Sequence, residues 1–92
     1  MLNWKLEQSN GRDGLTVQNS GQRHIRLAAL SLRDGNGQTV QVAAGLAGYV
    51  LAGSTMRFAL PPTVRKLSTA RLTVSAQSDV GPIDVILPKP SN

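Results

Sequence analysis

The clearest structural signal in this sequence is the stretch Ala70-Arg71-Leu72-Thr73-Val74-Ser75-Ala76-Gln77. Its apolar and polar side chains alternate without a break. Because successive side chains of a β-strand point to opposite faces of a sheet, a period of two predicts a strand with one buried face. The stretch therefore predicts a strand that buries Leu72 and Val74 and turns a polar face outward.

The same period of two recurs along the rest of the 92 residues, and no segment of useful length has the period of a helix. The further strands that it predicts are 2–7, 15–18, 23–32, 39–42, 49–51, 55–60 and 83–87. Seven or eight short strands spaced by about 8–12 residues are typical of a sandwich or a barrel. The turns differ in length, as Greek-key connections require. We therefore expect an all-β, immunoglobulin-like sandwich of antiparallel strands, formed by residues 1–92 as one domain with a flexible tail at 88–92.

Glycine, proline, asparagine and aspartate mark the connections between these strands. The expected turns and loops are 10–14, 19–21, 34–37, 45–48, 52–54 and 78–82, with a polar connection at 63–68. Asp34-Gly35-Asn36-Gly37 is the strongest of them, because Asp-Gly and Asn-Gly both favour positive φ. Pro61-Pro62 is expected to end the strand before it, because proline cannot donate a hydrogen bond to a ladder.

The third expected strand, 23–32, changes its pattern at Ala28-Ala29. Ile25 and Leu27 share one face, and Leu30 and Leu32 fall on the opposite parity. A β-bulge at the two alanines would return Leu30 and Leu32 to the core. Alternatively, the strand crosses from one sheet to the other at this point.

Composition describes a globular chain with an aliphatic core. Hydrophobic residues make up 40% of the sequence and charged residues 16%, and the aromatic residues are Trp4, Tyr49 and Phe58. Cysteine is absent, which excludes disulfides and cysteine-based zinc sites within the chain. No apolar run approaches the ~20 residues that span a membrane, so membrane insertion is not expected.

The net charge of +5 raises the hypothesis of a small nucleic-acid-binding barrel. The ten basic residues are scattered, however, and Arg65-Lys66 is the one adjacent pair. A nucleic-acid module concentrates its charge and interleaves aromatic residues for base stacking. We therefore expect no nucleic-acid partner. A salt titration with DNA or RNA would test this, because phosphate binding weakens steeply with salt.

Residues that could carry catalysis or bind a metal are few and dispersed. His24, the single histidine, lies close to Arg23 and Arg26, which makes it a poor metal ligand and a poor general base. No glycine-rich run is followed by a helix that could bind phosphate. No serine lies in a nucleophile elbow. We expect neither an enzyme nor a cofactor or metal site.

The acidic residues are Glu7, Asp13, Asp34, Asp79 and Asp84. We expect Asp13 and Asp34 to cap glycine turns and Glu7 to lie on a solvent face. Asp79 and Asp84 lie five residues apart in one expected hairpin. Paired carboxylates can transfer protons, but no other residue nearby supports a reaction.

The order of several short motifs resembles the C-terminal domain of PapD-like chaperones of the chaperone–usher pathway, most closely the archaic, spore-coat-like branch. The motifs are the opening Leu-x-Trp-x-Leu at 2–6, the strand 15–19 that ends in Asn, the strand 24–30, the segment Gly-Tyr-Val-Leu-Ala-Gly-Ser at 48–54, Phe-Ala-Leu-Pro at 58–61 and Ser-Asp-Val-Gly-Pro at 78–82. The resemblance covers nearly the whole chain. The chain departs from the family at Asn19-Ser20-Gly21-Gln22, where the family often has Asn-Pro-Thr/Ser-Pro, at Ala52, where it has proline, and in lacking a disulfide found in some members.

The resemblance implies a periplasmic chaperone that binds pilin subunits by donor-strand complementation and delivers them to an outer-membrane usher. Such chaperones have two immunoglobulin-like domains set in an L. The first domain, with the donor strand and the basic residues of the cleft, and the signal peptide are not in this chain. The second domain buttresses the cleft. Asp79 matches an acidic turn position that joins an interdomain salt-bridge network, although an ordinary turn residue would look the same.

A structural immunoglobulin-like module of a bacterial surface or adhesion protein would have the same strand pattern. The coding sequence upstream of Met1 would discriminate between the two hypotheses. A signal peptide followed by a domain with an alternating apolar donor strand favours the chaperone.

Overall fold

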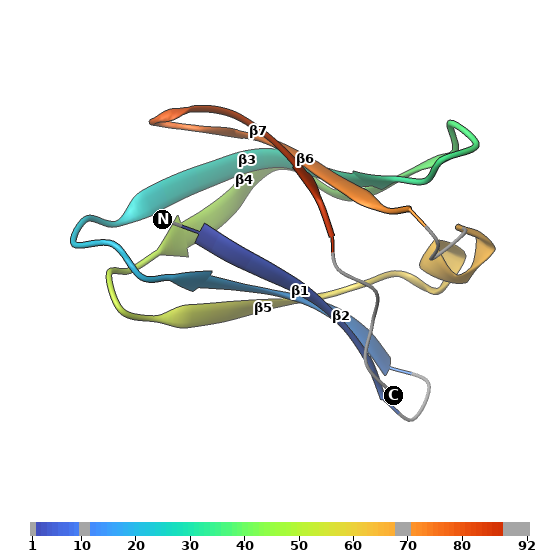
Figure 1. Cartoon of the computed structure of the whole chain (residues 1–92), viewed down its shortest axis with the longest axis horizontal. Coiled ribbons are helices and arrows are strands. Elements are labelled where there is room, and N and C mark those ends of the chain that lie inside the picture. Colours follow the sequence, from blue (N-terminus) through green and yellow to red (C-terminus); the bar gives the residue numbers. More distant parts are fainter. Residues whose placement is uncertain (1, 10–11, 68–70, 88–92) are drawn as a thin grey trace.

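The computed structural model describes residues 2–9, 12–67 and 71–87, which form two stacked antiparallel sheets (Figure 1). The strands are β1 (Leu2–Ser9), β2 (Arg12–Asn19), β3 (Ile25–Arg33), β4 (Thr39–Val50), β5 (Thr55–Ala59), β6 (Thr73–Ser78) and β7 (Gly81–Ile86). A short 3₁₀ helix, η1 (Pro62–Lys66), lies between β5 and β6. No α-helix occurs in the described ranges, which confirms the all-β prediction.

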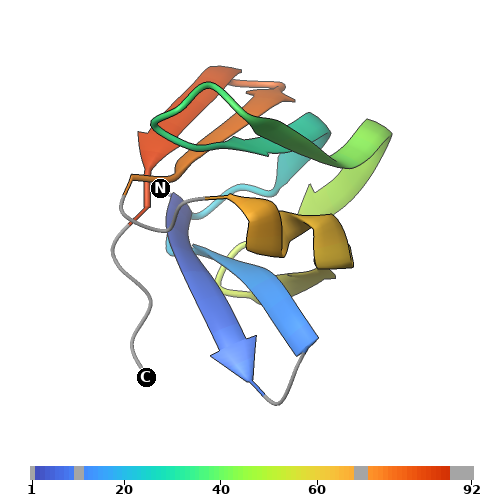
Figure 2. The same ribbon diagram turned by 90° about the vertical axis from the view of Figure 1, so that its right-hand side faces the viewer.

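The two sheets have the strand orders β1-β2-β5 and β4-β3-β6-β7. The chain changes sheet between β2 and β3, between β4 and β5, and again between β5 and β6. These crossovers are the Greek-key connections that the unequal turn lengths predicted, and they confirm the immunoglobulin-like sandwich. Figure 2 shows the two layers end-on, with η1 closing one end of the gap between them.

Both sheets contribute apolar side chains to one core between the layers. The fully buried large side chains include Leu15 and Val17 from β2 and Leu27, Leu30 and Leu32 from β3. Leu72 and Val74, which the opening stretch predicted to be buried, are 3% and 0% exposed. Burial of each such side chain stabilises the fold by about 1.5–3 kcal/mol, so the period of two supplies the main driving force for this architecture.

The irregularity predicted in the third strand is a β-bulge. Ala29 has φ of 52°, and the register between β3 and β4 shifts on both sides of Ala28. Because the bulge changes the parity of the strand, Leu27, Leu30 and Leu32 all reach the core. The alternative, a strand that crosses between sheets here, is wrong, because β3 pairs with β4 along its whole length.

The prediction of a loop at 45–48 followed by a separate strand 49–51 is wrong. β4 runs without interruption from Thr39 to Val50, and Leu51 lies beyond its end. Leu30 pairs with Ala43 and Ala28 pairs with Leu46, so β4 has more residues than β3 at the bulge. The glycines at 45 and 48 thus allow a strand to bend instead of ending it.

The predicted turn 10–14 is also wrong in its second half. β2 begins at Arg12, and Gly14 pairs with Glu7 of β1 and with Ala59 of β5. The pairing of β2 extends N-terminally beyond Leu15, since Asp13 pairs with Gln8 of β1 and its carbonyl accepts from the N–H of Leu60. Asp13 is therefore buried within the strand and does not cap a turn. Residues 10 and 11 lie outside the described residues.

The predicted polar connection 63–68 contains η1, and residue 68 lies outside the described ranges. Val64 and Leu67 are buried, because a spacing of three residues places side chains on the same side of a 3₁₀ turn. Pro62 lies at the start of the turn, where its missing N–H costs nothing. The two prolines thus end β5 as predicted and also begin η1.

The remaining expectations concern the two hairpins of the larger sheet and the tail. Asp34 caps its turn as predicted: its Oδ1 accepts hydrogen bonds from the backbone N–H groups of Asn36 and Gln38, both at 2.9 Å. Between β6 and β7 the turn is tighter than predicted, because Ser78 already pairs with Gly81. Leu87 is buried as expected, whereas Val85 stays 40% exposed on the edge strand. The expected tail at 88–92 lies outside the described residues.

Candidate functional site

Asp79, the candidate interdomain residue, lies in the two-residue turn between β6 and β7. Its Oδ1 accepts a hydrogen bond of 3.2 Å from the backbone N–H of Arg26, near the start of β3. The turn is held by Ser78, whose hydroxyl donates to the carbonyl of Gly81 at 2.6 Å and accepts from the N–H of Val80 at 3.2 Å. Asp79 is exposed, and no basic side chain of the described residues pairs with it. Its carboxylate therefore faces solvent with acceptor capacity to spare.

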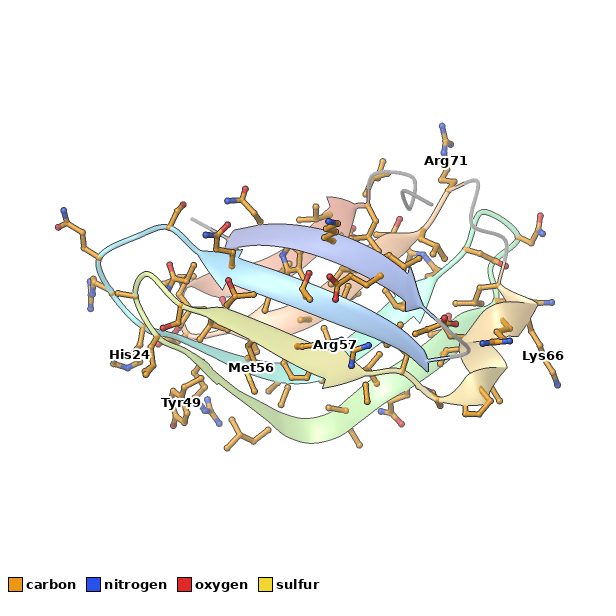
Figure 3. The ribbon with its side chains drawn as sticks, turned by 90° about the horizontal axis from the view of Figure 1, so that it is seen from below. His24, Tyr49, Met56, Arg57, Lys66 and Arg71 are labelled. Atoms are coloured by element: carbon orange, nitrogen blue, oxygen red, sulfur yellow. The ribbon has the colours of Figure 1, made fainter. Side chains whose placement is uncertain are left out.

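Several exposed apolar side chains lie at the same end of the sandwich as Asp79. Arg26 pairs with Tyr49 across β3 and β4, and the rings of Tyr49 and His24 pack edge-to-face with centroids 5.8 Å apart. Tyr49, Leu51 and Val80 are 50%, 60% and 73% exposed. Figure 3 shows His24 and Tyr49 together at one end, far from Lys66 and Arg71. We call this surface the Asp79 end; its residues are His24, Arg26, Tyr49, Leu51, Asp79 and Val80.

Sequence analysis identified Asp79 but missed the apolar residues beside it. The available signal was alternation within Tyr49-Val50-Leu51, where the two outer residues are exposed and Val50 is buried. Periodicity could not predict the exposure of Val80, because this residue lies in a turn and side chains alternate only within a strand. Its place beside Asp79 follows from the tight turn.

Asn19 holds the loops that carry this surface. Its fully buried side-chain amide donates to the carbonyls of Arg23, at 2.7 Å, and Val50, at 3.0 Å, while its Oδ1 accepts from the N–H of Gly21 at 2.9 Å. Its backbone exchanges hydrogen bonds with the loop after β4, from its N–H to the Ser54 carbonyl and from the Gly53 N–H to its own carbonyl. Through its side chain and its backbone together, this one residue connects both loops that cross between the sheets at this end.

The first described residue of β1 lies at the same end. Leu2 pairs with Asn19, so the chain enters the sandwich beside the two crossing loops. Figure 1 shows the start of β1 on the same side of the molecule as the β6–β7 turn and the start of β3. Any polypeptide that precedes Leu2 would therefore approach the domain near the Asp79 end.

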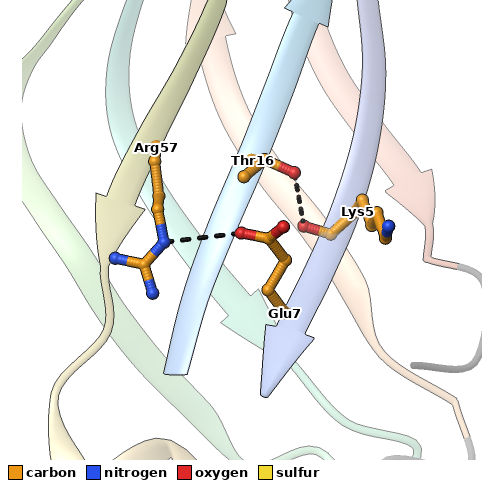
Figure 4. Close-up of polar contacts among 4 residues, drawn as sticks. All are labelled: Lys5, Glu7, Thr16 and Arg57. Atoms are coloured by element: carbon orange, nitrogen blue, oxygen red, sulfur yellow. Dashed lines mark hydrogen bonds and ion pairs between the residues drawn. The ribbon is translucent and has the colours of Figure 1, made fainter. Parts of the chain in front are cut away.

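The other acidic side chains have basic partners or structural roles. Glu7 pairs with Arg57 at 3.4 Å, Asp13 with Arg65 at 3.5 Å, and Asp84 with Arg33 at 3.8 Å. In Figure 4 the Glu7–Arg57 pair spans β2, next to a 3.3 Å hydrogen bond from the Thr16 hydroxyl to the Lys5 carbonyl. The Glu7–Arg57 and Arg33–Asp84 pairs each join two strands across the strand between them. Among the described acidic residues, Asp79 is left as the exposed carboxylate without a basic partner.

Gly14 has a role that sequence analysis did not anticipate. The Arg57 guanidinium lies over this glycine as it reaches from β5 toward Glu7 on β1, and a methyl group at position 14 would overlap it. Glycine within the strand therefore permits a side chain to cross it, which is one of the uses of glycine in sheets.

Within the described ranges, no three His, Cys, Asp or Glu side chains gather as a metal site would require. The same residues include no helix with the length and hydropathy needed to cross a membrane. Every buried side-chain nitrogen and oxygen among them has a hydrogen-bond partner. The Asp79 end presents one exposed carboxylate and three exposed apolar side chains, those of Tyr49, Leu51 and Val80.

A scan against protein-family models finds no match for this sequence, and a search among curated proteins finds none either.

Proposed function

We propose that this domain is the second domain of a PapD-like periplasmic chaperone that holds pilin subunits for delivery to an outer-membrane usher. Its role in that protein is to buttress the subunit-binding cleft of the first domain, and the Asp79 end is the surface that docks on that domain. The proposal rests on the ordered sequence motifs together with the immunoglobulin-like fold.

The observation that carries the proposal is the position of Asp79 relative to the start of β1. Asp79 lies beside Arg26, and Leu2 pairs with Asn19, whose side chain holds the loop before Arg26. A first domain that precedes this one in the chain would contact the same end of the sandwich. An exposed carboxylate without a basic partner is suited to pair with an arginine or lysine of such a domain.

The apolar residues at the Asp79 end support the same reading. Tyr49, Leu51 and Val80 are each at least half exposed, and a neighbouring domain would remove their surface from water. Tyrosine is frequent at protein interfaces because it combines an apolar ring with a hydroxyl that can form hydrogen bonds.

The distribution of charge gives no support to the nucleic-acid hypothesis. Arg33, Arg57 and Arg65 each face a carboxylate, so part of the positive charge is balanced locally. Lys66 and Arg71 lie at the opposite end from His24 and Tyr49 (Figure 3). A protein partner accounts for the exposed apolar residues of the Asp79 end better than phosphate contacts do.

The proposal is tested with the complete two-domain protein, exported with its own signal sequence and purified together with a pilin subunit. We expect the two-domain protein to retain the subunit, and the isolated domain of residues 1–92 to bind it weakly because it has no donor strand. Asp79→Asn in the two-domain protein should reduce retention about tenfold, the effect of losing one charge-assisted hydrogen bond of about 1.5 kcal/mol.

Asp84→Asn is the matched control, because Asp84 is an exposed carboxylate of the same hairpin that pairs with Arg33. It should leave retention unchanged. Sub-micromolar binding of a pilin by the isolated domain would refute the proposed role. A coding sequence without an upstream immunoglobulin-like domain would instead favour a structural module of a surface protein.

A further inference from the structure

The turn between β3 and β4 presents an Asn-Gly pair to solvent. Asn36 and Gly37 are both exposed, and a side chain at position 37 would meet no atom within 4 Å. Gly37 has φ of 85° and donates its N–H to the Asp34 carbonyl at 3.2 Å, the long limit of such a bond. Among the described residues no partner holds the side-chain amide of Asn36.

An asparagine followed by glycine can lose its side-chain amide without an enzyme. The backbone nitrogen of Gly37, after losing its proton to base, attacks Cγ of Asn36. The new N–Cγ bond closes a five-membered imide, the Cγ–Nδ2 bond breaks, and Nδ2 leaves as ammonia with the proton it gains. Water then opens the ring at Cγ to give aspartate, or at the backbone carbonyl to give isoaspartate. Glycine allows the attack because no Cβ hinders its nitrogen.

Asn19, followed by Ser20, provides the internal comparison. Its amide is buried and held by the carbonyls of Arg23 and Val50. Cγ of Asn19 cannot turn toward the next backbone nitrogen until these bonds open. The fold thus protects one asparagine and exposes the other.

We propose that Asn36 is a site of spontaneous deamidation in the folded protein, and that Asn19 reacts only when the domain unfolds. Either product places a second carboxylate in the turn that Asp34 already occupies. The Asp34 carboxylate accepts from the N–H groups of Asn36 and Gln38, and the extra backbone methylene of isoaspartate displaces one of these donors. Both products therefore add negative charge to the β3–β4 turn, and isoaspartate also loosens it. This inference does not depend on the proposed function.

The experiment is peptide mapping of the intact protein after incubation in mildly alkaline buffer. Trypsin cleaves after arginine and lysine, so Asn19 is recovered in the peptide 13–23 and Asn36 in the peptide 34–57, each as the one asparagine of its peptide. We expect conversion to aspartate and isoaspartate in 34–57, faster at higher pH. Conversion in 13–23 should be slower on the order of a thousandfold, because it requires global opening.

Two comparisons keep the proposal falsifiable. Asn36→Gln should abolish conversion in 34–57, because the longer side chain forms the ring far more slowly. In concentrated urea the wild-type chain should convert at both asparagines. If 34–57 stays unmodified in the folded protein but converts in urea, the turn protects Asn36 and the proposal is wrong. Equal rates for Asn19 and Asn36 in the folded protein would also overturn it.

Discussion

At the scale of single residues, Asn19 links more of this structure than any other side chain described above. It ends β2, and its side-chain amide donates to the Arg23 carbonyl in the loop 20–24 and to the carbonyl of Val50 at the end of β4. A buried carbonyl left without a donor costs about 1–3 kcal/mol. The position therefore requires a side chain with two donors and one acceptor, and asparagine has both in the shortest form.

We predict that Asn19→Ala lowers the free energy of unfolding by about 3 kcal/mol, because the carbonyls of Arg23 and Val50 lose their donor. Asn3→Ala makes the same chemical change at an exposed position of β1 and should alter stability by less than about 0.5 kcal/mol. Urea denaturation measures both. Equal effects for the two variants would show that the buried amide contributes nothing beyond its exposed counterpart.

Among the elements, β3 and β4 depart furthest from regular geometry. Ala29 adopts a left-handed conformation that alanine reaches at a cost of about 1–2 kcal/mol. This conformation directs Leu30 and Leu32 into the core, and their burial stabilises the fold by more than the cost of the strained alanine. The bulge thus follows from the sequence: two residues separate Leu27 from Leu30, whereas regular alternation would place one residue between them.

Replacing Ala29 by glycine should relieve the strain. We predict that Ala29→Gly raises the free energy of unfolding by about 0.5–1 kcal/mol, the relief of strain less the entropy that glycine loses on folding. Ala44→Gly, at an exposed position of the opposing strand, should lower it by about 0.5–1 kcal/mol. Thermal or urea denaturation of the two variants should give opposite signs, and a loss of stability in both would contradict a strained Ala29.

At the scale of the whole molecule, the two sheets share one core. The apolar face of each sheet is covered by the other sheet. Trp4 in β1 and Leu30 in β3 belong to different sheets and to the same buried cluster. Because each sheet depends on the other to exclude water, we expect both to unfold in a single transition, as small domains generally do.

We predict that Leu30→Ala, in the four-stranded sheet, lowers the free energy of unfolding by about 3 kcal/mol. The shift should be the same when unfolding is followed by the fluorescence of Trp4, in the three-stranded sheet, and by far-ultraviolet circular dichroism. Leu46→Ala removes the same atoms from a side chain that is 56% exposed and should have little effect. A Trp4 transition that does not move with Leu30→Ala would show that the sheets unfold independently.

Much of this architecture is encoded locally. Alternation of apolar and polar residues predicted where β1, β2, β3, β5 and β6 lie and which faces they bury, because a strand's side-chain direction depends only on its own backbone. Turn chemistry predicted the Asp34–Gly37 hairpin and the end of β5 for the same reason. The change of parity at Ala28-Ala29 was also visible in the sequence, but the choice between a bulge and a crossing between the sheets came from the pairing of β3 with β4.

Pairing between distant segments was decided by the tertiary structure. Gly14 and the glycines of β4 have the composition of turns, yet each lies within a strand, because a neighbouring strand supplies hydrogen bonds that local propensity does not register. The burial of Asn19 and the grouping of Asp79 with Tyr49 and Leu51 likewise depend on which loops meet at one end of the sandwich. A sequence pattern records the face that each strand buries; which strands become neighbours is set by packing all of those faces into one core.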